Sequence, residues 1–375
     1  MRKKTMNNLG IEVSNLGFGC MRFPTTEDGV IDRMQAEAML DEAMANGVTY
    51  YDTAYPYHNG ESEIVVGEIL NKYERSSYYL ATKLPIWSVE KQEDVRKYLE
   101  EQLAKLQKDY IDFYLIHAMN RERLETVKKC NVLEELVKLR EEGKIRYIGF
   151  SFHDEYAAFE EIINHFDWDF CQIQYNYMDT DEQAGDKGIR LAEEKGIPMV
   201  IMEPVRGGSL AKFSEDIESI FKTARPDKSI ASWAFRWVAG HSNCKVILSG
   251  MSSQEQVRDN LKTFTDYEPL SEQEKDALEE AVSALRARVQ NGCTGCRYCM
   301  PCPSGVSIPD IFKTWNSYHI YQSYSPVKFI WESIPDSAKP GKCVECGACE
   351  ELCPQKIRIR EQLKLAKADF DNKIW

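Results

Sequence analysis

The chain has 375 residues, with 47 Lys and Arg against 60 Asp and Glu, and its formal net charge is −13 at pH 7. Hydrophobic residues make up 43% and charged residues 29%, which is typical of a globular protein and excludes disorder, collagen and small disulfide scaffolds. The acidic charge disfavours a nucleic-acid-binding surface. Neither a signal peptide nor an apolar run of the roughly 20 residues that span a membrane is recognisable. We therefore expect a cytoplasmic protein that binds neither nucleic acid nor membrane.

Eight apolar runs of strand length recur along the first part of the chain, separated by segments of helical length. The runs cover residues 16–20, 48–52, 78–83, 111–117, 145–151, 169–175, 198–203 and 245–250. Near-continuous apolar strands are typical of parallel sheets that are buried on both faces. Amphipathic helical segments between them include residues 34–47, 95–107 and 133–144. The pattern predicts an α/β fold, a closed (β/α)₈ TIM barrel, with a doubly wound open sheet as the alternative.

Further elements flank this repeating pattern. Residues 5–17 predict a small hairpin with its turn at Asn8–Gly10, which we expect to cap the floor of the barrel. Residues 270–291 predict one long helix, because Ser271 followed three residues later by Glu274 forms a capping box.

Eight of the twelve cysteines fall in two bursts, residues 293–302 and 343–353. Such close spacing indicates metal ligands rather than disulfides. In ferredoxin-type loops three cysteines bind one [4Fe–4S] cluster, and a fourth, followed by proline, reaches the other cluster. Two clusters with crossed ligand sets are therefore predicted, with two structural zinc sites as the alternative. The sets are Cys293, Cys296, Cys299 and Cys353 for one cluster, and Cys343, Cys346, Cys349 and Cys302 for the other.

The first burst departs from the ferredoxin spacing by one residue, before Cys302. The segment between the bursts is rich in aromatic residues, which predicts helices around the clusters. We expect a barrel over residues 1–268, a connecting helix over 269–292 and a mainly α-helical, ferredoxin-like dicluster domain over 293–375.

Three of the predicted strands end in Asp52, Lys83 and His117, and Tyr57 lies in the loop after Asp52. In a barrel these strand ends converge on the catalytic face. A carboxylate, an ammonium, a phenol and an imidazole there suggest proton donation to a carbonyl. We expect Lys83 to lower the pKa of the phenol, which is about 10 in water, and Asp52 to keep Lys83 charged. Singly, each residue could cap a helix, be solvated or fill space, but the set of four indicates catalysis.

Six segments of the chain resemble the aldo-keto reductases, which are (β/α)₈ barrels that use NAD(P)H. These are residues 50–63, 80–83, 112–117, 148–151, 172–176 and 203–208. The resemblance assigns the family's catalytic tetrad to Asp52, Tyr57, Lys83 and His117, with Tyr57 as general acid. It implies an oxidoreductase that reduces a small-molecule carbonyl, or oxidises an alcohol in reverse. Residues 293–353 resemble the ferredoxin-type C-terminal extension of one branch of that family.

The resemblance also implies residues that bind the nucleotide. Ser151 and Gln172 match residues that hold the nicotinamide carboxamide, whereas Phe152 replaces an asparagine. Gly250 and Gln256 stand where NADP-preferring members have Lys and Arg, so the choice between NADH and NADPH stays open. The other implied contacts are Met21, Met202, Ser253, Asn260 and the pyrophosphate loop of Val205, Arg206, Gly207 and Gly208.

The sequence leaves the role of the clusters open, because nicotinamide transfers two electrons together whereas each cluster transfers one. A flavin normally bridges the two, and the sequence shows no motif for one. The clusters could support structure or sense redox state in a reductase, or exchange electrons with a ferredoxin- or flavodoxin-like partner. As an alternative, the chain could be an electron-transfer or redox-sensor protein whose barrel is a scaffold, although the complete tetrad argues against this.

Two further residues have alternative interpretations. Trp87, just after a predicted strand, could shape the substrate pocket or pack its loop. Arg22 could bind an anionic substrate or form a surface salt bridge.

Overall fold

The computed structural model describes residues 1–322 and 324–372. The chain forms two compact units, one of residues 1–204 and 232–270, and a second of residues 205–231 and 271 onward. Residues 205–231, which the sequence pattern assigns to the barrel, thus belong to the second unit. No helix among the described residues is long and apolar enough to cross a membrane.

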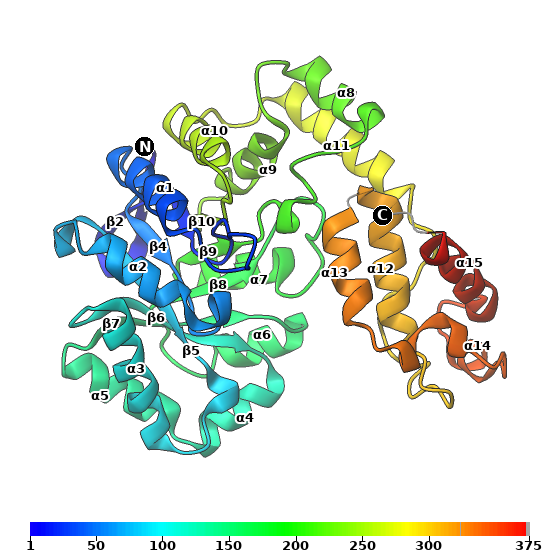
Figure 1. Cartoon of the computed structure of the whole chain (residues 1–375), viewed down its shortest axis with the longest axis horizontal. Helices are drawn as coiled ribbons and strands as arrows, with labels where there is room; N and C mark the ends of the chain where they lie inside the picture. The colour runs from blue at the N-terminus through cyan, green and yellow to red at the C-terminus, as the bar shows by residue number, and fades with distance from the viewer. Residues whose placement is uncertain (323, 373–375) are drawn as a thin grey trace. The chain divides into compact units, whose positions relative to one another are not determined.

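Eight parallel strands of the first unit form a closed barrel, in the order β10-β3-β4-β5-β6-β7-β8-β9 (Figure 1). The strands are β3 (Leu16–Gly19), β4 (Tyr50–Asp52), β5 (Tyr79–Leu84), β6 (Ile111–Met119), β7 (Ile145–Phe152), β8 (Phe170–Gln174), β9 (Met199–Met202) and β10 (Cys244–Ser249). Each overlaps one of the eight predicted runs, and no strand extends more than two residues beyond its run. The last strand closes on the first, with Ile247 paired to Leu16. The predicted (β/α)₈ barrel is therefore confirmed, and the open sheet is excluded.

Helices alternate with the strands and lie outside them, as Figure 1 shows. They are α1 (Arg33–Ala45), α2 (Ser62–Leu70), α3 (Gln92–Leu106), α4 (Arg121–Lys129), α5 (Val132–Glu141), α6 (Tyr156–Ile163), α7 (Gly185–Glu194), α9 (Ile230–Ala239) and α10 (Gln254–Thr265). Apolar residues spaced by three or four positions give each helix one face to bury. In α3, for example, Val95, Leu99, Leu103 and Leu106 are buried. Sequence periodicity therefore located α1, α3 and α5, which overlap the helical segments predicted at 34–47, 95–107 and 133–144.

An N-terminal hairpin packs against the interior of the barrel. Its strands β1 (Lys3–Met6) and β2 (Ile11–Ser14) are antiparallel, and Gly10 adopts a left-handed conformation (φ 64°) in the turn. Met6 and Val13 are fully buried in the same apolar cluster as barrel residues such as Phe113. The hairpin thus seals the barrel interior, as the sequence predicts.

The second unit is mainly helical, as predicted. Its helices are α8 (Glu215–Ala224), α11 (Glu272–Arg286), α12 (Ile308–Tyr321), α13 (Tyr324–Ser333), α14 (Ala348–Leu352) and α15 (Ile359–Asp371). Helix α11 begins with the predicted capping box, in which the Ser271 N–H donates to Glu274 at 2.8 Å. The core of the cysteine-bearing region is aromatic: Trp331 stacks on Phe370 with ring centroids 3.9 Å apart. Cysteines from both bursts pack against this core.

Helices α2 and α3 approach so closely at Gly67 that a side chain would collide there. A Cβ on Gly67 would lie 2.4 Å from the backbone oxygen of Leu106. We expect Gly67→Ala to lower the free energy of unfolding by about 1–3 kcal/mol, the usual cost of overpacking, although alanine favours helix. Urea denaturation measures the change. The exposed Glu100→Ala in α3 is the control, with an expected change within about 0.5 kcal/mol. Equal stability of the two variants would contradict the close approach.

Candidate functional site

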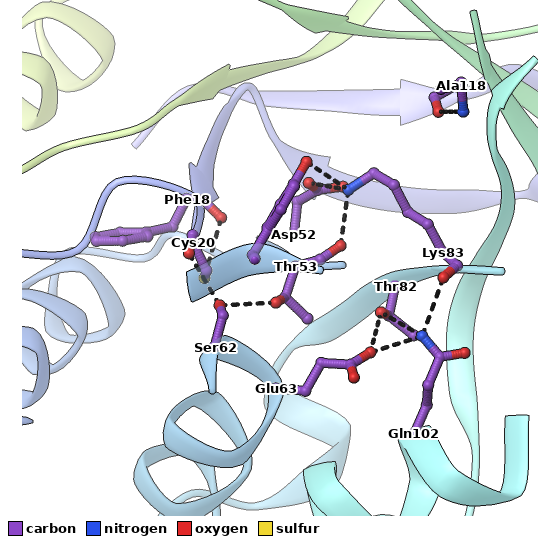
Figure 2. A network of polar contacts seen from close by, with 12 residues as sticks. Phe18, Cys20, Asp52, Thr53, Ser62, Glu63, Thr82, Lys83, Gln102 and Ala118 are labelled. Atoms are coloured by element: carbon purple, nitrogen blue, oxygen red, sulfur yellow. Dashed lines mark hydrogen bonds and ion pairs between the residues drawn. The ribbon is translucent and has the colours of Figure 1, made fainter. Parts of the chain in front are cut away.

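A buried lysine connects the predicted catalytic groups at one end of the barrel strands (Figure 2). The Lys83 Nζ donates hydrogen bonds to Asp52 Oδ1 at 2.6 Å and to the Thr53 backbone oxygen at 2.7 Å. It also lies 3.4 Å from the Tyr57 hydroxyl. Lys83 is 1% exposed and Asp52 2% exposed. The ammonium therefore links the carboxylate to the phenol in a site largely shielded from water.

The fourth predicted residue, His117, lies beside Tyr57. Their ring centroids are 6.1 Å apart and the rings are nearly perpendicular. The His117 Nδ1 is buried and has no hydrogen-bond partner within the described part of the chain. The next residue, Ala118, has a positive φ of 53°, and its N–H donates to Ser151 Oγ at 2.7 Å. The structure thus brings all four predicted residues together, with an imidazole that still has an unused polar atom.

Burial sets the protonation of these groups. Burial raises the pKa of Tyr57 more than the nearby Lys83 lowers it. Lys83 thus lowers the pKa of the phenol, as expected, but the net pKa lies above its ordinary value because burial has the larger effect. Burial opposes the charge on Lys83, but Asp52 and Tyr57 together outweigh burial and raise the pKa of the lysine. The pKa of His117 is well below its ordinary value, because of burial and then the Lys83 charge. The site therefore holds a protonated phenol, an ammonium and a neutral imidazole at neutral pH.

A second layer of buried polar residues, which the sequence analysis missed, fixes the backbone of Lys83 (Figure 2). Glu63 of α2 is fully buried and accepts hydrogen bonds from Thr82 Oγ1 and Gln102 Nε2, each at 2.6 Å. Gln102 of α3 also donates to the Lys83 backbone oxygen at 3.0 Å. The signal in the sequence was a polar residue on the apolar face of each helix.

The two residues implied to bind the nicotinamide carboxamide are polar and buried. Ser151 and Gln172 are each 1% exposed, and Gln172 Oε1 has no hydrogen-bond partner among the described residues. An orphaned buried acceptor fits an amide group that donates two hydrogens. Phe152 is buried against Phe159, with ring centroids 5.2 Å apart, and cannot form the hydrogen bonds of an asparagine.

The two methionines implied as contacts differ in exposure. Met202 is half-buried and packs against the barrel core, whereas Met21 is 55% exposed.

In the segment implied for the adenosine phosphate, several residues serve the helix that follows. Ser253 caps α10 and accepts a hydrogen bond from the Gln256 N–H at 3.3 Å. Gln256 Oε1 accepts in turn from the Ser252 N–H at 2.7 Å. Asn260 donates to Ser249 Oγ at 2.8 Å and is buried. These contacts position the segment through hydrogen bonds within the protein.

Positive charge near this segment is sparse. The guanidinium of Arg258 pairs with Glu42 at 3.0 Å. The stem of the exposed Arg22 lies against Gly250, so closely that a Cβ there would be 3.2 Å from it. Of these two arginines, Arg258 therefore already has its charge paired with the Glu42 carboxylate.

The loop implied for the pyrophosphate belongs to the second unit. Its amides at Gly208 and Leu210 both donate to the Val205 backbone oxygen, at 2.9 and 3.1 Å. Gly207 has a positive φ of 62°, and the Arg206 guanidinium lies 4.7 Å from the ring centre of Tyr321. Because these amides donate within the turn, a phosphate cradle in this loop stays a prediction.

The cysteines of the two bursts line two cavities. One cavity of about 330 Å³ is lined by Cys293, Cys296, Cys299 and Cys353, among other residues. A second cavity of about 320 Å³ is lined by Cys302, Cys343, Cys346 and Cys349. Each cavity thus collects three cysteines of one burst and one of the other, which is the crossed arrangement that the spacing predicts.

The donor chemistry of these cavities suits a polynuclear cluster. Each cavity offers four cysteine thiols, and thiolates are the usual ligands of iron–sulfur clusters. Burial raises the pKa of Cys293, but a hydrogen bond from the Gly295 N–H opposes that effect. Gly295 has a positive φ of 72°, a conformation that glycine adopts without strain. Amides directed at sulfur in this way stabilise thiolates and cluster sulfur.

Comparison with known proteins identifies the family to which this chain belongs. The profile of the aldo/keto reductase family matches residues 15–283. The chain belongs to the aldo/keto reductase family. A second profile, the 4Fe-4S dicluster domain, matches residues 292–357 of this aldo/keto reductase. The resemblance inferred from the motifs is therefore confirmed for both parts of the chain.

Relatives of this aldo/keto reductase are oxidoreductases. L-galactose dehydrogenase of Arabidopsis thaliana is 27% identical over 309 residues, which cover 77% of this chain and 95% of the relative. NADH-specific methylglyoxal reductase of Escherichia coli (strain K12) is 25% identical over 330 residues, covering 76% and 99%. Among solved structures, the holo form of aldo-keto reductase AKR11C1 from Bacillus halodurans is 25% identical with a TM-score of 0.62, covering 75% and 96%. The chain thus combines an aldo/keto reductase barrel, whose relatives are oxidoreductases, with a domain of the 4Fe-4S dicluster type.

Proposed function

We propose that the barrel catalyses NAD(P)H-dependent reduction of a small-molecule carbonyl, or the reverse oxidation of an alcohol, with Tyr57 as general acid. The observation that carries this proposal is the buried Lys83 ammonium, 2.6 Å from Asp52 and 3.4 Å from the Tyr57 hydroxyl. A phenol that keeps its proton at neutral pH can give it to a developing alkoxide. The adjacent ammonium then stabilises the phenolate that remains.

A nicotinamide bound in this site would supply the hydride. Gln172 and Ser151 would hold its carboxamide, since one offers a buried oxygen without a partner among the described residues and the other a hydroxyl. His117 stays neutral and donates a hydrogen bond to the substrate oxygen, which places that oxygen next to Tyr57. Asp52 keeps the lysine charged and fixed.

The first test removes only the proposed acid. Tyr57→Phe keeps the ring and should lower the rate of carbonyl reduction by about 10²–10⁴-fold, the usual contribution of a positioned general acid. Nucleotide affinity should be unchanged. Tyr55→Phe is the matched control, because the Tyr55 hydroxyl instead bonds to Glu101 at 3.1 Å. Steady-state rates with NADH and NADPH measure the effect.

A companion variant tests the lysine in the same assay. Lys83→Met should also lower the rate, and the double variant with Tyr57→Phe should lose less than the two effects combined, because the groups act as one unit. Near-full activity of Tyr57→Phe would favour the alternative function, an electron-transfer or redox-sensor protein with the barrel as scaffold.

We further propose that NADH binds at least as well as NADPH. Gly250 and Gln256 offer no positive charge to a 2′-phosphate, and Arg258 is paired with Glu42. Titration of both nucleotides measures the two dissociation constants. Arg22→Met, which removes the cation beside Gly250, should leave their ratio unchanged. A dissociation constant for NADPH at least tenfold lower than for NADH, about 1.4 kcal/mol, would contradict this assignment.

For the C-terminal domain we propose two [4Fe–4S] clusters, held by the crossed sets of cysteines that line the two cavities. Each cluster supplies one-electron transfer. The cysteine thiolates would bind the iron, and backbone amides such as the Gly295 N–H would stabilise the thiolates. The clusters exchange electrons with a ferredoxin- or flavodoxin-like partner or sense redox state. A flavin would be the usual link between the clusters and nicotinamide, although the sequence shows no motif for one.

Metal analysis tests both the number of clusters and the crossing. Anaerobically prepared protein should contain about eight irons per chain. Cys296→Ala with Cys353→Ala should lose about four, because both residues line one cavity, whereas Cys296→Ala with Cys346→Ala should lose nearly all. Each double variant serves as the matched control of the other. Stoichiometric zinc without iron would refute the clusters, and equal iron loss in both variants would refute the crossing.

A further inference from the structure

An arginine of α4 lies close to the catalytic histidine. The guanidinium of Arg123 is 5.3 Å from the ring centre of Trp87, and that ring is 5.0 Å from the ring of His117. Arg123 Nη1 also donates a hydrogen bond to the backbone oxygen of Ala118, the residue after His117. The side chain is thereby anchored next to the group that faces the substrate oxygen.

The start of α4 places this side chain with precision. Asn120 caps the helix, and its Oδ1 accepts a hydrogen bond from the Arg123 N–H at 2.7 Å. The cap fixes the first turn, and the hydrogen bond to Ala118 fixes the guanidinium. Such an arginine has lost much of its conformational freedom before any ligand arrives, which favours ligand binding.

The Arg123 guanidinium has no carboxylate within ion-pair distance among residues 1–322 and 324–372. Its neighbour Arg121 pairs with Glu155 at 3.9 Å, and Lys83 pairs with Asp52. After burial and the Lys83 charge, Arg123 is among the groups that lower the pKa of His117. A half-buried, unpaired guanidinium therefore raises the potential around the site where the carbonyl binds.

We propose that the carbonyl substrate carries an oxyanion group, a carboxylate or a phosphate, which Arg123 binds while Trp87 lines the path between that group and the carbonyl. A guanidinium offers two parallel N–H donors that match either anion. Its ring contact with Trp87 leaves donors available, because an arginine has five. This inference rests on the proposed carbonyl reduction and narrows its substrates to anionic aldehydes or ketones.

Matched pairs of substrates test the inference. One pair is 4-formylbenzoate and its methyl ester, and the second is glyceraldehyde 3-phosphate and glyceraldehyde. We expect the holoenzyme to prefer the anionic member of at least one pair by tenfold or more in kcat/KM. The pair with the larger preference identifies the anion.

Variants assign the preference to Arg123. Arg123→Met keeps the length of the side chain and should bring the preference close to one, mainly by raising KM for the anionic member. Arg123→Lys should restore part of the preference. Arg121→Met, two residues earlier and already paired with Glu155, is the control that should leave kinetics unchanged.

The outcomes separate the two proposals. Reduction of neutral and anionic members with equal kcat/KM, or a preference that survives in Arg123→Met, overturns the anion site and leaves the carbonyl reductase standing. The proposed function fails, and this inference with it, if none of the four compounds is reduced and the Tyr57→Phe variant has the same rate as the parent enzyme.

Discussion

The Lys83 ammonium, taken almost fully out of water, is the charge around which the barrel site is organised. A buried charge is tolerated only when a counter-charge and hydrogen bonds replace its hydration. Asp52 and the Thr53 carbonyl supply these, and the chain must hold them in place. The buried pair of Glu63 and Gln102 holds the backbone of Lys83 from two neighbouring helices, which can meet because Gly67 lets them approach.

This arrangement separates the state of the protein at rest from its state during reaction. At rest, burial keeps the proton on Tyr57, and the pKa of the phenol is raised. In the proposed reaction the same ammonium stabilises the phenolate left behind, so its effect is greatest where negative charge develops. A lysine on β5, the strand that follows the loop of the proton donor, thus supplies the charge that the reaction needs.

The two units obtain their stability in different ways. The barrel has a continuous apolar interior that the N-terminal hairpin seals with Met6 and Val13. The cysteine-bearing unit has a smaller, aromatic core, against which cysteines of both bursts pack. Metal–thiolate bonds contribute folding free energy in such domains, so the proposed clusters would couple the stability of this unit to its iron content.

Local patterns in the sequence predicted a large part of the molecule. The eight strands, the capping box at Ser271 and the crossed cysteine sets follow from periodicity and spacing, because strand pairing and cluster loops impose short-range rules. Packing between distant segments decided the rest. The raised pKa of Tyr57, the support from Glu63 and the unpaired Arg123 beside Trp87 depend on desolvation and on contacts between different βα units. Neither composition nor spacing encodes these, since burial of a group is set by everything that packs around it.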